Sequence, residues 1–222
     1  MRVSRCVGCK NFPCRDVDHG CHIVPGISLK PESISMVMVS EATPAKADDY
    51  YYAKGNPLFQ QTTVQAFHDA GVDVSSLKDL LLRGVYLTTA VKCGKTGYGI
   101  QAETIRECSL LLEKELRLFP HVKVLMLMGD VAIRALNYIA QRAGEKRVIP
   151  AGSTYKIRAH EYAFRGMRVF PSYLQAGPSF FIEQSKRRMI SEDIAAAMGL
   201  VSAPGRLPAV SKRSPEGEDA TH

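Results

Sequence analysis

Short apolar runs that alternate with amphipathic segments restrict the fold of this chain more than any other feature. The apolar runs have the length of strands and occupy residues 34–39, 85–91, 122–128 and 167–170. The amphipathic segments have helical spacing and occupy residues 59–70, 75–82, 103–118, 131–143 and 179–198, with a hairpin-like stretch at 155–164. Strands that alternate with helices predict a parallel sheet that is covered on both faces and joined by right-handed crossovers.

Length and composition predict one domain with a tail. The chain has 222 residues and is 45% hydrophobic, enough to bury a full core. We place the domain at residues 1–199 and expect the polar, Pro/Gly/Ser-rich residues 200–222 to be disordered. No apolar run approaches the roughly 18 residues of a membrane span, and the N-terminus lacks the apolar stretch of a signal peptide. We therefore expect a cytoplasmic monomer without a membrane partner.

The net charge of +7 belongs to the predicted domain, because the basic and acidic residues of the tail cancel. A basic domain of this size favours a polyanionic partner such as nucleic acid. The run Lys186-Arg187-Arg188 fits the same picture, although it is equally typical of a solvated helix face.

Four cysteines form two separated pairs that predict a metal or iron–sulfur site. Cys6 and Cys9 form a C-x2-C turn at the N-terminus, while Cys93 ends a predicted strand and Cys108 lies in the next helix. Thiolates at such positions can converge on one centre and clip the N-terminus to the domain. In a reducing cytosol, clustered cysteines favour metal over disulfides.

A competing zinc site is also consistent with the cysteine spacing. Its ligands would be Cys6, Cys9, Cys14 and Cys21, with His19 and His22 beside the last of these.

Ligands of open parallel sheets bind beyond the carboxyl ends of the strands. The loops at these positions span residues 40–59, 88–93, 129–130 and 171–174. The glycine-containing stretch at 94–97 lacks the spacing of a phosphate-binding P-loop. The functional site is therefore expected in these four loops.

The four loops carry motifs that resemble a known family. The motifs are Ser-Glu-Ala-Thr-Pro at 40–44, Pro-Leu-Phe at 57–59, Tyr-Leu-Thr-Thr-Ala-Val-Lys-Cys at 86–93, Leu-Met-Gly-Asp-Val-Ala at 127–132 and Pro-Ser-Tyr-Leu at 171–174. Together they resemble the uracil-DNA glycosylase superfamily, specifically its iron–sulfur branch, family four. The resemblance runs from Cys6 to about Met198.

This resemblance implies a fold, an activity and a cofactor. The fold would be a three-layer α/β/α sandwich with a short, mainly four-stranded parallel sheet. The activity would be that of a DNA glycosylase in base-excision repair, which hydrolyses the N-glycosidic bond of uracil or a related damaged base in DNA. A 4Fe-4S cluster would be held by Cys6, Cys9, Cys93 and Cys108, with zinc as the alternative.

The chain departs from the family at the chemical centre. Thr89 stands where the family has an Asn that hydrogen-bonds uracil, and Phe170 stands where it has a His. A second hypothesis is therefore a catalytically silent nucleic-acid-binding iron–sulfur protein on the same fold. A relative that captures DNA covalently is disfavoured, because residues 92–108 contain no histidine.

Excision requires that the target base leaves the DNA stack. A carboxylate then stabilises the positive charge that develops on the sugar, and hydrogen-bond donors stabilise the negative charge that develops on the base. For the carboxylate we favour Asp49, then Asp48, then Glu41. Phe59 is the stacking candidate, and Thr89 and Asn56 are the donors. Each has a plain structural alternative, such as a core aromatic, a solvated loop acid or an ordinary strand residue.

DNA contacts are expected on both sides of this site. The candidates are Lys92, Pro171, Ser172, Tyr173 and Leu174, with Lys95 as a further phosphate contact. Leu174 or Gln175 would act as the wedge in the vacated stack.

Overall fold

Four parallel strands form the centre of the sheet, and a short antiparallel strand closes each edge. The computed structural model describes residues 1–202, and the strand order is β1-β3-β2-β4-β6-β5. The strands are β1 Val17–Asp18, β2 Met36–Thr43, β3 Val85–Lys95, β4 Val124–Met128, β5 Tyr162–Phe164 and β6 Met167–Ser172. Strands β3, β2, β4 and β6 run parallel, while β1 and β5 are antiparallel to their neighbours.

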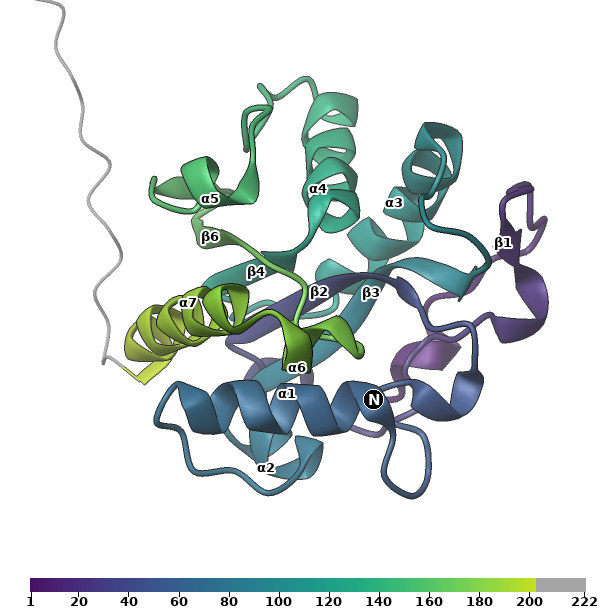
Figure 1. Cartoon of the computed structure of the whole chain (residues 1–222). Coiled ribbons are helices and arrows are strands. Elements are labelled where there is room, and N and C mark those ends of the chain that lie inside the picture. The colour runs from purple at the N-terminus through teal and green to yellow at the C-terminus, as the bar shows by residue number, and fades with distance from the viewer. Residues whose placement is uncertain (203–222) are drawn as a thin grey trace, which may run out of the picture.

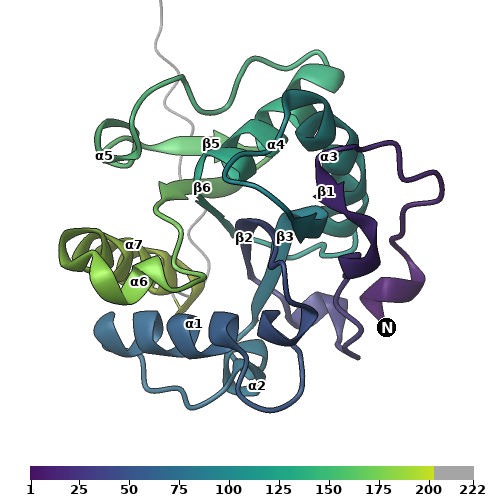
Figure 2. The same cartoon turned by 45° about the vertical axis from the view of Figure 1, so that its right-hand side comes forward.

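Helices cover both faces of this sheet (Figures 1 and 2). The α-helices are α1 Leu58–Asp69, α2 Leu77–Leu82, α3 Ala102–Leu116, α4 Asp130–Arg142, α5 Thr154–Ile157, α6 Ser179–Ile182 and α7 Gln184–Ser202. Short 3₁₀ turns are η1 Val3–Arg5, η2 His19–Cys21, η3 Pro31–Ser33 and η4 Ala47–Asp49. The α/β/α sandwich predicted from the sequence is therefore confirmed.

Alternating strand residues build two separate cores. In β2, Val37 and Val39 pack with residues of α3, α4 and the N-terminal segment, whereas Met36 and Met38 pack with α1, α2 and α7. Strands of a parallel sheet are buried on both faces, which explains why they read as continuous apolar runs in the sequence.

Two sequence predictions are corrected by the fold. The hairpin expected at 155–164 is instead helix α5 followed by β5, which pairs with β6. The predicted last helix is divided into α6 and α7 at Glu183. Helix α7 continues to Ser202, three residues past the predicted end of the domain at residue 199. The tail predicted at 200–222 lies outside the described residues from 203 onward. No helix among residues 1–202 combines the length and the apolar character needed to cross a membrane.

The N-terminal segment is fastened to α3 by Asp16. The Asp16 carboxylate accepts hydrogen bonds from the Gln101 N–H, at 2.7 Å, and from the Thr104 hydroxyl at the start of α3. Its backbone carbonyl accepts a third hydrogen bond from the Thr96 hydroxyl, at 2.9 Å. Asp16 therefore caps a helix from a distant part of the chain and holds the cysteines of the N-terminus close to α3.

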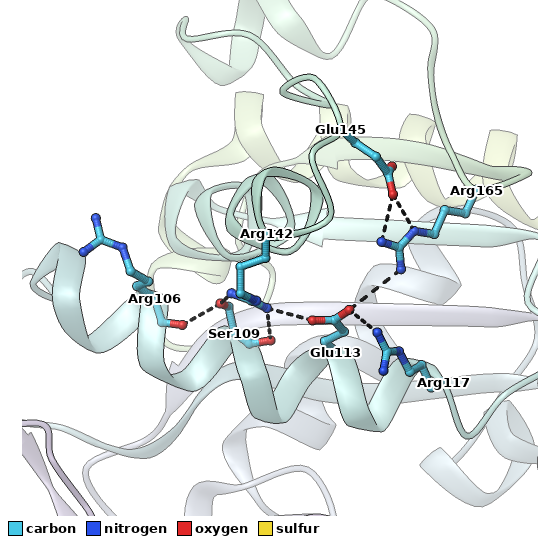
Figure 3. A network of polar contacts seen from close by, with 7 residues as sticks. All are labelled: Arg106, Ser109, Glu113, Arg117, Arg142, Glu145 and Arg165. Carbon is cyan, nitrogen blue, oxygen red and sulfur yellow. Dashed lines mark hydrogen bonds and ion pairs between the residues drawn. The ribbon is translucent and has the colours of Figure 1, made fainter.

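A network of charged side chains joins α3, α4 and the β5–β6 turn (Figure 3). Glu113 of α3 contacts Arg117 at 2.5 Å, Arg142 of α4 at 2.9 Å and Arg165 of the turn at 3.9 Å. Arg165 is also paired with Glu145, at 2.8 Å. Because α3 and α4 run back from the carboxyl ends of the strands, this network stabilises the opposite end of the sandwich.

Candidate functional site

A cleft of about 280 Å³ opens where β2 and β3 end. Its lining consists of residues 41–45 at the end of β2, Phe59 of α1, residues 95–97, Leu174 and residues 176–178. A second hollow of about 180 Å³ lies beside it and shares Glu41 and Leu174 as lining residues. Both hollows lie at the carboxyl ends of the strands, the position expected for a ligand site in this class of fold.

Glu41 is the carboxylate at the centre of this region. It lies near the end of β2, its side chain is 19% exposed, and its Oε2 atom is 3.4 Å from Nζ of Lys95. On its other side it packs against Gly129, which has a φ of +93° and precedes α4. A Cβ atom on Gly129 would come within 2.5 Å of Glu41 Oε1, so only glycine leaves room for the carboxylate here.

The two acids favoured from the sequence lie elsewhere. Asp48 and Asp49 belong to η4, where Asp48 is exposed and Asp49 is half-buried. Neither lines the cleft or the neighbouring hollow. The geometry reverses the expected order and favours Glu41 as the acid of the site.

Phe59 lies in the first turn of α1 and lines the cleft with only 9% of its surface exposed. Its ring packs edge-on against Tyr51, with centroids 5.1 Å apart. Among the described residues, Phe59 is the only aromatic residue in the cleft lining, and it is also a core aromatic. The two roles proposed from the sequence therefore do not exclude each other.

Of the two proposed base donors, Thr89 is buried and Asn56 is exposed. Thr89 pairs with Ser40 of β2 and shares the sheet face of Leu87, which packs with the α1 layer. Its hydroxyl is fully buried and has no hydrogen-bond partner within residues 1–202. The backbone carbonyl of Asn56 accepts from Gln61, and its side chain does not line the cleft.

Lys92 cannot contact phosphate in this structure, which corrects the prediction from the sequence. Its side chain is 0% exposed and forms an ion pair with Glu115 of α3, which is equally buried. The Lys92 ammonium also donates to the Thr88 hydroxyl at 2.7 Å and to the Thr89 carbonyl at 2.6 Å. Tyr86 completes the network by donating to Glu115 at 2.6 Å. This cluster fastens β3 to α3 below the site.

The expected DNA loop is divided between core and surface. Pro171 and Ser172 are the last residues of β6 and are buried, and the Ser172 hydroxyl donates to Asp193 of α7 at 2.6 Å. These two side chains are therefore unable to meet DNA. Tyr173 and Leu174 are partly exposed and line the hollow, where the Lys186 ammonium lies 5.6 Å from the centroid of the Tyr173 ring.

Gln175, the alternative wedge, is also buried. Its side-chain amide donates to the Thr63 hydroxyl of α1 at 3.0 Å. Leu174 therefore remains as the wedge candidate.

Four free cysteines, Cys9, Cys14, Cys93 and Cys108, pack with the hydrophobic core on the α3 and α4 side of the sheet. Cys93 and Cys108 are buried, and the Cys14 thiol lies within hydrogen-bonding reach of Cys108. Burial raises the pKa of Cys93 to about 12, and the charges of Cys108, Cys14 and Cys9 add to the rise. Cys6, by contrast, is exposed and its thiol contacts the Arg2 carbonyl at 3.8 Å.

A backbone N–H group points at one of these sulfur atoms, because the Phe12 N–H donates to Cys9 at 3.3 Å. Burial raises the pKa of Cys108 to about 11, with a further contribution from Cys14. Thiols that lie close enough to raise one another's pKa, two of them buried, could serve together as ligands of a metal centre.

This set of thiols does not form a single-ion site. Within residues 1–202, no three Cys, His, Asp or Glu side chains surround one point closely enough to hold one metal ion.

Comparison with known proteins identifies the class. The model of the uracil DNA glycosylase superfamily matches residues 30–192, and the chain belongs to this superfamily. A stretch of 58 residues is 43% identical to the type-5 uracil-DNA glycosylase of Thermus thermophilus. That alignment covers 26% of this chain and 26% of the relative. The superfamily expected from the loop motifs is thus confirmed, although the relative matched here is of type 5 rather than family four.

Proposed function

We propose that this protein is a DNA glycosylase of base-excision repair that hydrolyses the N-glycosidic bond of uracil or a related damaged base. Its membership of the superfamily supports the reaction class. The observation that carries the proposal for this chain is the cleft at the strand ends, where the Glu41 carboxylate and the Phe59 ring line the same cavity.

The cleft residues match the needs of the reaction. Breaking the bond builds positive charge on the sugar, which a carboxylate such as Glu41 stabilises while it positions water. Phe59 supplies a flat apolar surface against which an extruded base can stack. The Thr89 hydroxyl has no partner within residues 1–202 but lines neither hollow, so the hydrogen bond from Thr89 to a base that the sequence suggested stays a prediction.

DNA would be held along the neighbouring hollow. Leu174 projects between the two hollows and is the candidate wedge for the vacated stack. Tyr173 and the half-exposed Lys186 beside it are the candidates for contact with the backbone. Lys186 thus takes the place that the sequence suggested for Lys92.

We further propose that an iron–sulfur cluster is the protein's cofactor and that its ligands are Cys9, Cys14, Cys93 and Cys108. Cys14 replaces Cys6 in this set, because it lies against Cys108 whereas Cys6 is exposed. Bound there, the cluster would be structural and would clip the N-terminal segment to β3 and α3. The excision chemistry needs no soluble cofactor.

The activity is tested by incubating the protein with uracil-containing single- and double-stranded oligonucleotides and then cleaving abasic sites with alkali. Strand scission at the uracil position is the expected result. Retention of uracil-DNA without scission would instead support the catalytically silent binding protein, a reading motivated by Thr89 and Phe170 at the family's Asn and His positions.

A further inference from the structure

In the part of the chain that the structure describes, the lining of the cleft contains one pair of opposite charges. Glu41 contributes the carboxylate, and Lys95, the last residue of β3, contributes the ammonium group. The distance between Oε2 of Glu41 and Nζ of Lys95 is 3.4 Å. The Lys95 side chain is 32% exposed, so the ammonium is accessible from the cleft. Within residues 1–202, Lys95 is the one cationic side chain in this lining.

Other charged groups nearby already have partners outside the cleft. Arg187 lines the second hollow and is paired with Asp69, and Lys186 is paired with Glu183 at 2.5 Å. Phe170, at the position of the family's histidine, packs with the α1 and α7 core. Lys95 is therefore the cation placed to meet negative charge that develops inside the cleft.

Cleavage of the N-glycosidic bond separates charge in a fixed direction. As the bond breaks, its electron pair passes to the base, and the sugar becomes cationic. Before the reaction, the carboxylate and the ammonium group are paired with each other. As charge develops on the substrate, the carboxylate can instead interact with the cationic sugar and the ammonium group with the anionic base. Such preorganised charges contribute most to a rate, because they act where charge develops in the transition state.

We propose that Lys95 is a catalytic residue that stabilises the departing base as an anion, and this proposal rests on the proposed glycosylase function. Lys95 would take the role of the family's histidine, whose position is occupied by Phe170 in this chain. The bond between C1′ and the base nitrogen breaks, and its electrons remain on the base. A water molecule adds its oxygen to C1′ and gives a proton to Glu41. The base leaves beside the Lys95 ammonium and afterwards takes up a proton from solvent.

The test compares leaving groups in single-turnover excision. Substrates carry either uracil or 5-fluorouracil, whose anion is intrinsically more stable and needs less help to depart. Lys95→Gln is expected to slow uracil excision about 100-fold, the typical loss for one preorganised donor, but to slow 5-fluorouracil excision by only about 10-fold. Lys95→Arg, which keeps the charge, should recover much of the rate on uracil. Glu41→Gln should slow both substrates to a similar extent.

The control is Lys46→Gln, which removes a positive charge from the exposed part of the first loop outside the cleft. It should leave both rates near those of the wild type. Equal slowing of both substrates by Lys95→Gln would overturn the inference, because a phosphate contact or a structural role does not depend on the leaving group. A wild type that excises neither base would overturn the proposed function, and the assignment of Lys95 with it.

Discussion

At the scale of single residues, Glu41 is distinguished from the other acids of the first loop by what surrounds it. Lys95 lies on one side, and Gly129 leaves space for the carboxylate on the other. Asp48 and Asp49 have no comparable setting, because η4 carries them away from the cleft.

We therefore expect Glu41→Gln to lower the single-turnover rate of uracil excision by about 100-fold or more with little change in DNA affinity. The lost interaction is strongest in the charged transition state. Asp48→Asn and Asp49→Asn serve as matched controls and should remain within about threefold of the wild type. Rapid-quench kinetics and a DNA-binding titration measure both quantities. A larger loss for Asp49→Asn than for Glu41→Gln would restore the order that the sequence suggested.

The sequence alone could name Glu41 as a candidate but could not select it. All three acids follow the same predicted strand, and only the path of the chain through η4 separates them in space. The sequence predicts a phosphate contact for Lys92 because it flanks Cys93 at the end of a strand, but it does not show that the side chain turns inward to Glu115. One available signal was Glu115, which lies on the same helical stripe as Leu111 and Leu112 and so marks a buried acid in need of a partner.

At the scale of elements, the sheet and its main helices followed from apolar periodicity, because strands buried on both faces and amphipathic helices leave distinct patterns. The edges did not. The two-residue strand β1 and the three-residue strand β5 are too short to show a period. Along β3, the Tyr52 hydroxyl accepts a hydrogen bond from the Leu87 N–H at 3.0 Å and donates one to the Leu87 carbonyl at 3.2 Å. A side chain thus pairs with the backbone groups of β3 at a position where no neighbouring strand does.

The contact between β3 and α3 depends on the buried pair of Lys92 and Glu115. Lys92→Met should destabilise the protein by about 3–5 kcal/mol, because it leaves a buried carboxylate without its cation. Replacing both residues, as in Lys92→Met with Glu115→Leu, should recover much of this loss. Urea unfolding of the single and double variants measures the difference. If the single variant were as stable as the wild type, the pair would have no role in holding the two elements together.

The Glu113 network is expected to make stability depend on pH. Burial acts to raise the pKa of Glu113, but the hydrogen bond from Arg142 and the charges of Arg117, Arg142 and Arg165 outweigh it and lower the pKa below 4.5. A carboxyl group with a lowered folded-state pKa stabilises the fold fully above its unfolded pKa, and this contribution disappears as pH falls through the folded-state value.

Glu113→Gln should therefore lower the free energy of unfolding by roughly 1.5–3 kcal/mol at pH 7, the range for hydrogen bonds to charged groups. The difference from the wild type should shrink as the pH is lowered below about 4.5. Urea titrations between pH 3 and pH 7 provide the measurement. A difference that stays constant across this range would show that the carboxylate charge is not what stabilises the contact.

At the scale of the whole molecule, the N-terminal segment is joined to the sandwich through Asp16 and through the cysteine set. Under the cluster proposal, Cys14→Ala should abolish the broad iron–sulfur absorption near ~400 nm and lower the iron content and the thermal stability, because cluster binding is linked to folding. Cys6→Ala is the matched control and should retain iron and colour. Loss of iron in Cys6→Ala with retention in Cys14→Ala would return the ligand set to the one predicted from sequence. Stoichiometric zinc without iron in anaerobically purified protein would contradict the cluster itself.

The central claim is that the cleft at the strand ends breaks the N-glycosidic bond, and the most direct measurement is of the products themselves. Wild-type protein and Glu41→Gln are incubated with a uracil-containing duplex, and free uracil is quantified by mass spectrometry alongside abasic sites. We expect the wild type to release uracil and abasic sites in equal amounts, and Glu41→Gln to bind the same DNA while releasing about 100-fold less in the same time. Uracil release that is undiminished in Glu41→Gln, or no release by a wild type that binds the duplex, would contradict the account.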